Sequence, residues 1–250
     1  MGLDGVISDM IYLIDEENEP VMMQNSQEIL DLNDKAVSCM LKNENETALR
    51  HLQEALARPC WKEIVDDEDY HLLPIRQRPP YYDDACPISS ITVGSGLKDD
   101  GIFEFFNRAL VIPRGCNFLL ACPKKKRLCL AILLYNKGLL FHLEGIKTGD
   151  SKILSQALTC YGYAYYTIES PSRTYGFHDA LLVVCSLFNN MGHIHSIQMN
   201  CEKTRQCLKW LQSIFAHKAA KRVLYPGQYS YFFRYISVDS SRQLLVAPTA

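Results

Sequence analysis

Two histidines separated by one residue, His193 and His195, are the first side chains in this sequence that suggest metal chemistry. The residues around them have the apolar pattern of a helix. Residues two positions apart on a helix point about 200° apart, so the two imidazoles cannot hold one ion. No acidic residue or cysteine lies one turn away on either face. We therefore expect no metal site here.

Ten cysteines could act as nucleophiles or zinc ligands. None forms a CxxC pair, and neither Cys201 and Cys207 nor the group at 116, 122 and 129 has the spacing of a zinc site. A thiol enzyme built on Cys160 or Cys185 with a nearby histidine would need a low thiol pKa, which a sequence does not reveal. We predict reduced thiols, several of them packed in the core, and no cofactor.

Other sequences that could support catalysis do not match known motifs. Gly94-Ser95-Gly96, followed by Lys98, lacks the spacing of a phosphate-binding loop, and no GxSxG elbow or kinase set is present. The acidic clusters at 66–69 and 99–100 lack the order of a calcium loop. We predict that the chain has no catalytic residues and is not an enzyme.

The basic run Lys124–Arg127 could bind anions or act as a nuclear import signal. We interpret it instead as a solvated turn that precedes an apolar helix. The net charge of −2 gives no reason to expect a nucleic-acid partner, and the hydrophobic content of 48% is typical of a soluble globular protein. No apolar run approaches the roughly 20 residues that span a bilayer. We expect a cytoplasmic protein, or a nuclear one, without a membrane partner.

Apolar residues recur with the 3.6-residue period of amphipathic helices in three parts of the chain. Between the first and second parts, prolines and acidic clusters alternate with short β-like runs. The sequence therefore predicts a mainly α fold, with three helical hairpins in an irregular stack and a small β element from the insertion and the C-terminal segment. The single domain, 1–250, has hairpins at about 26–59, 129–170 and 179–217, an irregular β-containing insertion at 60–128, and a β-like tail at 228–240.

The three hairpins share a spacing of residues. The first helix of each hairpin has a small residue, at Ala36, Gly138 or Gly192. Three residues follow at fixed spacing on the second helix: the first is small, the second is large, and the third is either small or large. The offsets are the same in the first and third hairpins and seven residues longer in the second, which predicts an extended turn. Glycine inside a helix costs roughly 0.5–1 kcal/mol, so we expect it where two helices cross closely. The repeat positions are Ala36, Ala48, Leu52 and Ala55; Asn136, Gly138, Phe141, Ala157, Tyr161 and Ala164; and Asn190, Gly192, Leu208 and Leu211.

This spacing resembles the tetratricopeptide repeat (TPR), over about 40% of the chain. The phrases LLYNKGLLFHLEG and NNMGHIHS, with the ending APTA, also resemble a set of uncharacterised TPR-like proteins common in diatoms. The resemblance implies a concave surface lined by the first, or A, helix of each hairpin. Carried over to this chain, the partner-binding positions are Asn33, Val37, Met40, Tyr135, Leu139, His142, Asn189, His193 and Ser196.

The function that this resemblance implies is a non-catalytic protein-interaction module or scaffold, with another protein or peptide as partner. The lining lacks Lys and Arg, so capture of a C-terminal carboxylate is not expected. We expect Asn136 and Asn190 to be structural, bonding to a neighbouring helix or loop. The alternatives are a nucleic-acid-associated helical repeat and, ranked below it, a cryptic thiol enzyme or hydrolase.

Overall fold

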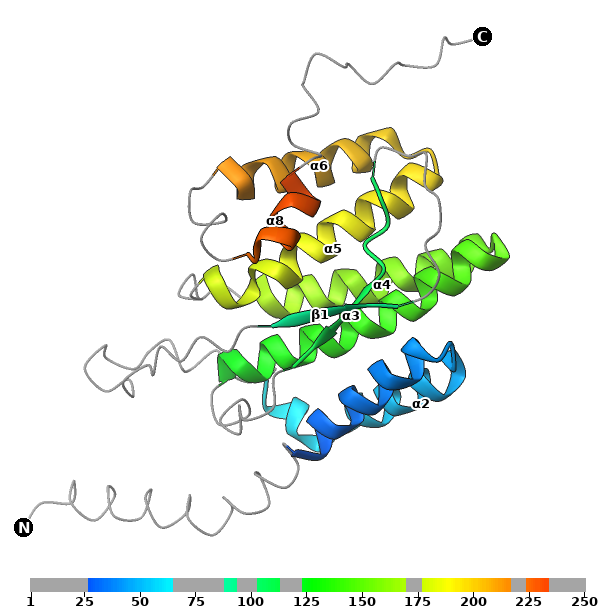
Figure 1. Cartoon of the computed structure of the whole chain (residues 1–250), viewed down its shortest axis with the longest axis vertical. Coiled ribbons are helices and arrows are strands. Elements are labelled where there is room, and N and C mark those ends of the chain that lie inside the picture. The colour runs from blue at the N-terminus through cyan, green and yellow to red at the C-terminus, as the bar shows by residue number, and fades with distance from the viewer. Residues whose placement is uncertain are drawn as a thin grey trace, which may run out of the picture.

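Six helices of twelve residues or more lie in the part of the chain that the structure, a computed structural model, describes. They pair into three antiparallel hairpins (Figure 1). The prediction of a mainly helical fold with a small β element is therefore confirmed. The described residues are 27–64, 88–93, 103–112, 123–169, 177–216 and 224–233. The hairpins comprise helix 27–41 with α2 (Asn45–Leu56), α3 (Pro123–Thr148) with α4 (Ser151–Glu169), and α5 (Phe177–Ile197) with α6 (Cys201–Ala216).

Each hairpin turn contains one residue with a left-handed backbone. These residues are Asn43 (φ 60°), Gly149 (φ 70°) and Met199 (φ 55°). A left-handed residue directly after a helix ends it and redirects the chain. In the second turn, the Lys152 N–H donates to Asp150 Oδ1 at 2.7 Å, so Asp150 caps α4.

Gly138 lies at a point of close contact between α3 and α4. A Cβ atom at this position would lie 2.7 Å from Cε1 of Tyr161 and 3.1 Å from Cβ of Cys160. The predicted crossing at Gly138 is confirmed. The predicted long turn is wrong, because α3 continues to Thr148 and α4 begins at Ser151. The seven extra residues lengthen the two helices by about one turn each.

Gly192 has a different role from Gly138. A Cβ atom there would meet the ring of Phe103, with Cζ at 2.6 Å, rather than a residue of α6. The two glycines therefore have equivalent positions on the first helices of their hairpins, as predicted, but they pack against different kinds of neighbour. In the third hairpin, the missing side chain makes room for an aromatic ring from the insertion.

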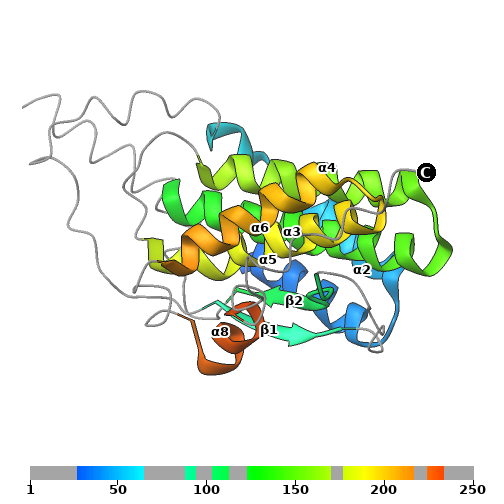
Figure 2. The same ribbon diagram turned by 90° about the horizontal axis from the view of Figure 1, so that it is seen from above.

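The A helices (27–41, α3 and α5) lie between the B helices (α2, α4 and α6) and a front layer (Figures 1 and 2). The front layer contains strands β1 (Ser89–Thr92) and β2 (Arg108–Val111) and helix α8 (Pro226–Phe233). β1 and β2 are antiparallel, with Ser89 opposite Val111 and Thr92 opposite Arg108. β2 packs on α3, and α8 packs on α5. The insertion thus covers the face of the A helices.

The predicted β-like tail at 228–240 is wrong for its described part, because Pro226–Phe233 is helical. Proline at the first position of a helix has a suitable φ and loses no intrahelical hydrogen bond. The Tyr225 N–H donates to Oε1 of Gln228 at 3.2 Å, which is half of a capping box. Residues 234–240 lie outside the described residues.

The basic run does not form a turn before the second hairpin. Helix α3 begins at Pro123, six residues earlier than predicted, and includes the run. Lys126 and Arg127 are 7% and 8% exposed, so the prediction of a solvated segment is wrong for these two side chains.

Two helical segments, Lys125–Thr148 and Ala180–Ile197, are long and apolar enough to cross a membrane by length and composition. The most apolar 18-residue stretch is 61% buried inside the protein in the first segment and 72% buried in the second. Burial of this kind is typical of core helices of soluble proteins, so these segments are weak support for a membrane location.

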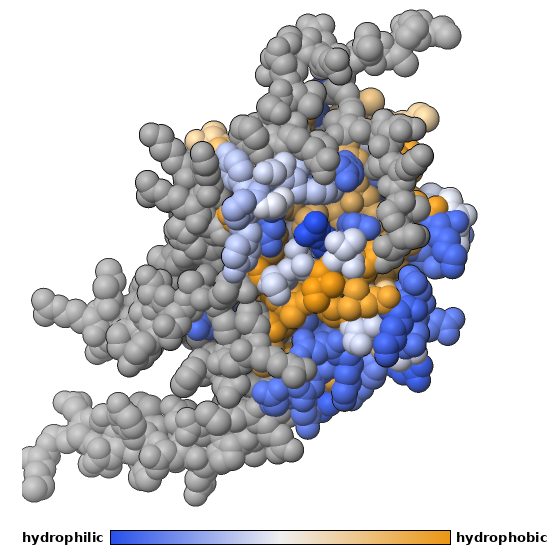
Figure 3. Space-filling model, in the orientation of Figure 1, coloured by the Kyte–Doolittle hydropathy of each residue, from blue (hydrophilic) through white to orange (hydrophobic). Residues whose placement is uncertain are grey.

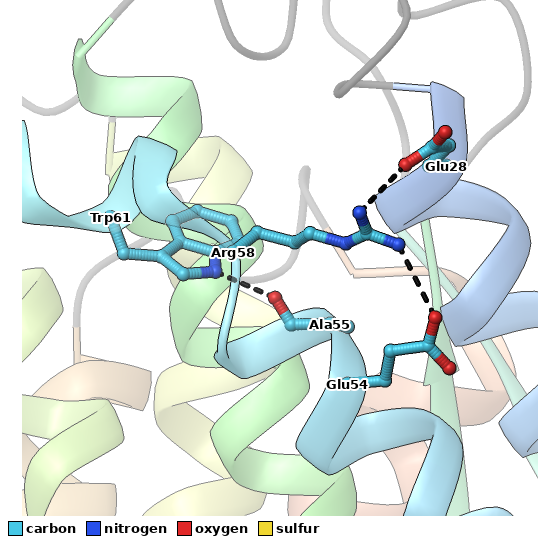
Figure 4. A network of polar contacts seen from close by, with 5 residues as sticks. All are labelled: Glu28, Glu54, Ala55, Arg58 and Trp61. Atoms are coloured by element: carbon cyan, nitrogen blue, oxygen red, sulfur yellow. Dashed lines mark hydrogen bonds and ion pairs between the residues drawn. The ribbon is translucent and has the colours of Figure 1, made fainter.

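A polar network joins the two helices of the first hairpin (Figure 4). Arg58 lies 2.9 Å from the carboxylate of Glu28 and 3.3 Å from that of Glu54. The indole N–H of Trp61, in the short 3-10 helix η1 (Pro59–Ile64), donates to the carbonyl of Ala55 at 2.7 Å. The bond from Trp61 satisfies a carbonyl at the end of α2 and fixes the direction of the chain that follows.

Candidate functional site

Residues 103–112, which we call the strap, cross the face formed by the A helices. The strap includes β2 and the five extended or bent residues before it. Phe103, Phe106 and Leu110 are at most 1% exposed. The strap therefore fills the groove in which the sequence analysis placed a partner.

The strap is held on α3 by one side chain that bonds both backbone groups of one residue. Asn136 accepts a hydrogen bond from the Leu110 N–H at 2.9 Å and donates to the Leu110 carbonyl at 2.9 Å. Its second N–H donates to Oδ1 of Asn33, on helix 27–41, at 2.9 Å. Asn33 also donates to the Leu110 carbonyl at 3.4 Å. Asn136 therefore bonds to a neighbouring helix and to the strap, which are the kinds of contact predicted for it.

Asn190 holds the strap on α5 in the same way. It accepts from the Phe106 N–H at 3.1 Å and donates to the Phe106 carbonyl at 3.2 Å. The neighbouring Asn189 donates to the Glu104 carbonyl at 2.8 Å, and the Tyr135 hydroxyl lies 3.1 Å from the Arg108 carbonyl. Asn190 therefore also bonds to the strap and to a neighbouring helix, as predicted.

These contacts follow the two-residue period of an extended chain. Backbone groups of residues 104, 106, 108 and 110 are bonded by side chains of the A helices. The odd-numbered residues face β1, where Val93 N–H donates to the Asn107 carbonyl at 2.8 Å. Side-chain amides and a phenol therefore occupy the place of a third strand at the inner edge of β2. Recognition of this kind uses the backbone and is largely independent of the strap's side chains.

A pair of buried histidines lies beneath the strap. Nε2 of His142, on α3, is 2.9 Å from Nδ1 of His193, on α5, and Nδ1 of His142 is 3.3 Å from the hydroxyl of Tyr161. The ring of Phe105 lies 4.2 Å from the His142 ring and 5.4 Å from the His193 ring, centroid to centroid. This cluster joins the second hairpin, the third hairpin and the strap at one point.

Burial disfavours the charged forms of His142, Tyr135 and Tyr161. Burial and the neighbouring His193 lower the pKa of His142 well below its usual range. Burial raises the pKa of the Tyr135 and Tyr161 hydroxyls well above the usual value for tyrosine. Removal from water disfavours the charged form of any such group. His142 therefore takes part in these hydrogen bonds as a neutral imidazole at neutral pH.

The nine predicted partner-binding residues lie on the A-helix face, but that face is not open. Eight of them are at most 4% exposed, and the ninth, Ser196, is partly exposed. In this structure the strap contacts Asn33, Tyr135, His142, Asn189 and His193. Val37, Met40 and Leu139 belong to the apolar core. The expected free concave surface is corrected to a groove that the chain itself occupies.

The structural positions of the repeat are mostly in the core. Small residues at Ala36, Ala48, Ala55, Ala157 and Ala164 are fully buried, as close helix packing requires. Leu52, Tyr161 and Leu211 are also fully buried, whereas Phe141 and Leu208 are partly buried against the same core.

Four of the described cysteines, at 129, 160, 185 and 207, are buried, whereas Cys201 is exposed. Burial raises the pKa of Cys129, Cys160 and Cys185, and it raises that of Cys207 to about 11. A thiol with a raised pKa is a poor nucleophile at neutral pH. Among the described residues, no three side chains of His, Cys, Asp or Glu are grouped so that they could hold a metal ion.

The front of the molecule has an apolar band over β1 and β2, with hydrophilic residues of the first hairpin beside it (Figure 3). Ile91 of β1 is 39% exposed on this face. On the B helices, Tyr163 and Tyr166 are 62% and 77% exposed. The other exposed large apolar side chains of the described residues are Leu41, Ile197, Met199, Trp210 and Tyr225.

Sequence reasoning missed both the strap's position and the His142–His193 pair. Both histidines were among the predicted lining residues, so the shared face was a signal that they could meet. The contact between them spans 51 residues and depends on how two hairpins pack, which no local pattern specifies.

No protein-family model matches this chain, and comparison with curated proteins and with solved structures finds none similar to it.

Proposed function

We propose that this chain is a non-catalytic protein-interaction module whose A-helix groove takes an extended segment of another protein. The partner's segment would replace the strap and form the same contacts with Asn136 and Asn190. The groove reads backbone groups at every second residue, so any strand with suitable side chains fits it.

The observation that carries this proposal is the pair of two-way bonds made by Asn136 and Asn190. An amide side chain that bonds both the N–H and the C=O of one residue reproduces what a neighbouring β-strand offers. The buried asparagines, at 0% exposure, would be costly to leave unpaired. A groove that carries them needs an extended occupant.

The test is binding of a labelled peptide with the sequence of residues 103–112 and a charged solubility tail. The strap competes within the chain, so the protein should carry Phe103→Ala, which removes one buried anchor and leaves Asn136 and Asn190 intact. We expect saturable binding to the Phe103→Ala protein and at least about tenfold weaker binding to the unaltered chain.

Two N-methylated peptides provide the matched control. Methylation at the positions of Phe106 and Leu110 removes the N–H groups that the two asparagines accept, and should abolish binding. Methylation at the position of Ala109, which is opposite Ile91 of β1, removes no bond to the asparagines and should weaken binding less. Equal binding of both methylated peptides, or no saturable binding to a folded Phe103→Ala protein, would overturn the proposal.

A further inference from the structure

Helix α4 (Ser151–Glu169) has an outer face without charged side chains over about four turns. Between residues 153 and 168 its sequence contains no Asp, Glu, Lys or Arg. The neighbouring B helices differ, because α2 exposes Arg50 and α6 exposes Lys209. The exposed residues of this stretch, which we call the α4 face, are Ser155, Gln156, Thr159, Gly162, Tyr163 and Tyr166.

Two large rings lie on the α4 face. Tyr163 and Tyr166 are 62% and 77% exposed. Tyrosine is enriched in protein interfaces, because its ring supplies a large contact area while its hydroxyl can stay near water. Surfaces that bind other proteins often combine tyrosine with serine and glycine. The α4 face therefore has the composition of a protein-binding surface.

Gly162 lies in the middle of the α4 face and makes no contact that requires a glycine. Its backbone is not left-handed, and a Cβ atom there would meet no atom within 4 Å. Glycine inside a helix is less stable than alanine, so it favours positions where another backbone approaches closely. Gly138 meets that condition inside the chain. Gly162 meets it only if the approaching backbone belongs to another molecule.

The hydroxyl groups of this surface are already bonded within α4. Ser155 Oγ donates to the Ser151 carbonyl at 2.8 Å, and Thr159 Oγ donates to the Ser155 carbonyl at 3.0 Å. Thr167 bonds the Tyr163 carbonyl in the same way, at 2.8 Å. A second helix can therefore cover these side chains without leaving an unpaired donor.

The order of large and small residues along the α4 face complements its own reverse. Residues 155, 159, 162 and 166 are three or four apart and so lie on one side of the helix. In an antiparallel pair with its twofold axis between residues 160 and 161, Tyr166 lies over Ser155 of the second copy. Gly162 then lies beside Thr159 of the second copy. Each contact occurs twice, as twofold symmetry requires.

Charge and area also fit a second copy. The exposed Lys152, at the N-terminal end of α4, comes beside the C-terminal end of the other α4, where the helix dipole is negative. The α4 face itself is uncharged, so two copies do not repel each other there. Four largely exposed tyrosine rings, of about 150–250 Å² each, supply on the order of half of the about 1,200 Å² that a stable interface buries.

We propose that α4 of one copy packs antiparallel on α4 of a second copy and so forms a twofold-symmetric dimer. The α4 face belongs to the B-helix layer, on the side away from the strap and β1 (Figure 2). The dimer therefore leaves the A-helix groove of each copy uncovered and does not depend on the proposed function. Two grooves on one particle would bind a partner with two segments more tightly than one groove does.

Sedimentation equilibrium of the full-length protein tests the dimer, between about 1 µM and about 100 µM. We expect a mass that rises with concentration to twice that of the monomer. Tyr166→Lys removes an interface ring and adds a charge, and should weaken dimerisation at least about tenfold. Tyr225→Lys is the matched control, at a tyrosine that is 54% exposed outside α4, and should leave dimerisation unchanged. A monomer at every concentration, or equal effects of the two variants, would refute the proposal.

Gly162→Ala separates an interface glycine from an ordinary surface glycine. A methyl group at the crossing holds the two helices apart and should weaken dimerisation about tenfold. The same change should make the dilute monomer more stable. Because the two effects have opposite signs, a folding defect cannot imitate the loss of the dimer. If Gly162→Ala dimerises as well as the unaltered protein, the helices do not cross at Gly162.

A pair of introduced cysteines tests the register, in a Cys201→Ser background that removes the exposed native thiol. Ser155→Cys with Tyr166→Cys should form an intermolecular disulfide under a mild oxidant such as diamide, identified by mass spectrometry at high protein concentration. Within one helix the two positions are about 16 Å apart, too far for a disulfide. A disulfide that joins the Ser155→Cys sites of two copies would indicate parallel helices. That result, or a dimeric sample without the link from 155 to 166, contradicts the antiparallel pairing.

Discussion

The Asn136 side chain bonds both the N–H and the carbonyl of Leu110, at 2.9 Å each, across 26 residues of sequence. This contact fixes the register of β2 on α3, because a shift of one residue would turn the bonded groups away from the helix. Asn190 repeats the relationship with Phe106. Two asparagines on neighbouring hairpins thus fix both the position and the direction of the strap.

Replacement of Asn136 by leucine should strongly destabilise the fold. The change leaves the buried N–H and carbonyl of Leu110 without their strongest partner, and each unpaired group costs about 1–3 kcal/mol. We expect Asn136→Leu to lower the free energy of unfolding by about 2–6 kcal/mol, measured by urea denaturation. Lys137→Leu, at the next and partly exposed position of α3, should change it by less than about 1 kcal/mol.

Two glycines in the second hairpin should respond in opposite directions to alanine. Gly138→Ala places a methyl group 2.7 Å from the ring of Tyr161, which bonds to His142 and Asn190 and has little room to move. We expect a loss of about 1–3 kcal/mol, and a larger loss for Gly138→Leu. Gly162, on the exposed side of α4, has no atom within 4 Å of such a methyl group. Gly162→Ala should stabilise by roughly 0.5–1 kcal/mol. Unchanged thermal stability of Gly138→Ala would show that the helices do not meet there.

Gly192 and Phe103 should be energetically coupled. Gly192→Ala forces a methyl group against the Phe103 ring, with the closest atom at 2.6 Å, and should destabilise by about 1–3 kcal/mol. Phe103→Ala alone should cost about 3–5 kcal/mol, because the ring is fully buried. In the double variant the clash is absent, so the combined loss should be smaller than the sum. If the stability loss of the double variant equals the sum of the two single losses, the contact between Gly192 and Phe103 is contradicted.

Stability should fall as the solution is acidified. Burial lowers the pKa of His142 in the folded protein, so below about pH 6.5 the unfolded chain binds a proton that the folded chain does not. The contribution of neutral His142 to the free energy of unfolding is fully present above the pKa that this histidine has in the unfolded chain. It is lost as the pH falls, by up to about 1.4 kcal/mol per pH unit for each such histidine. Denaturation curves between about pH 7.5 and about pH 5 should show this slope, and His142→Gln should reduce it. A stability that rises on acidification over this range would contradict burial of the neutral pair.

Local patterns predicted the hairpins because each A and B helix has its own apolar period, and they predicted the crossing at Gly138 because glycine inside a helix needs a packing reason. The destination of the strap depends on contacts up to 127 residues away in the sequence, such as the bond from the Tyr231 hydroxyl to the Glu104 carbonyl, and local patterns do not contain such contacts. In the tail, the aromatic residues suggested a strand, but Pro226 and Gln228 carried a helix-start signal that outweighed them. The length of α3 was underestimated because the buried side chains of Lys126 and Arg127 were interpreted as solvated charge.

The strap's position also determines when the protein can assemble. The ribosome releases residues 103–112 before either helix that clamps them, and Asn190 follows Phe106 by 84 residues. At about 5–20 residues per second, this interval lasts on the order of 4–17 s. During that time Phe103, Phe105 and Phe106 have no groove to enter. A nascent chain with three unburied aromatic rings is a target for chaperones, and the third hairpin must form before it is protected.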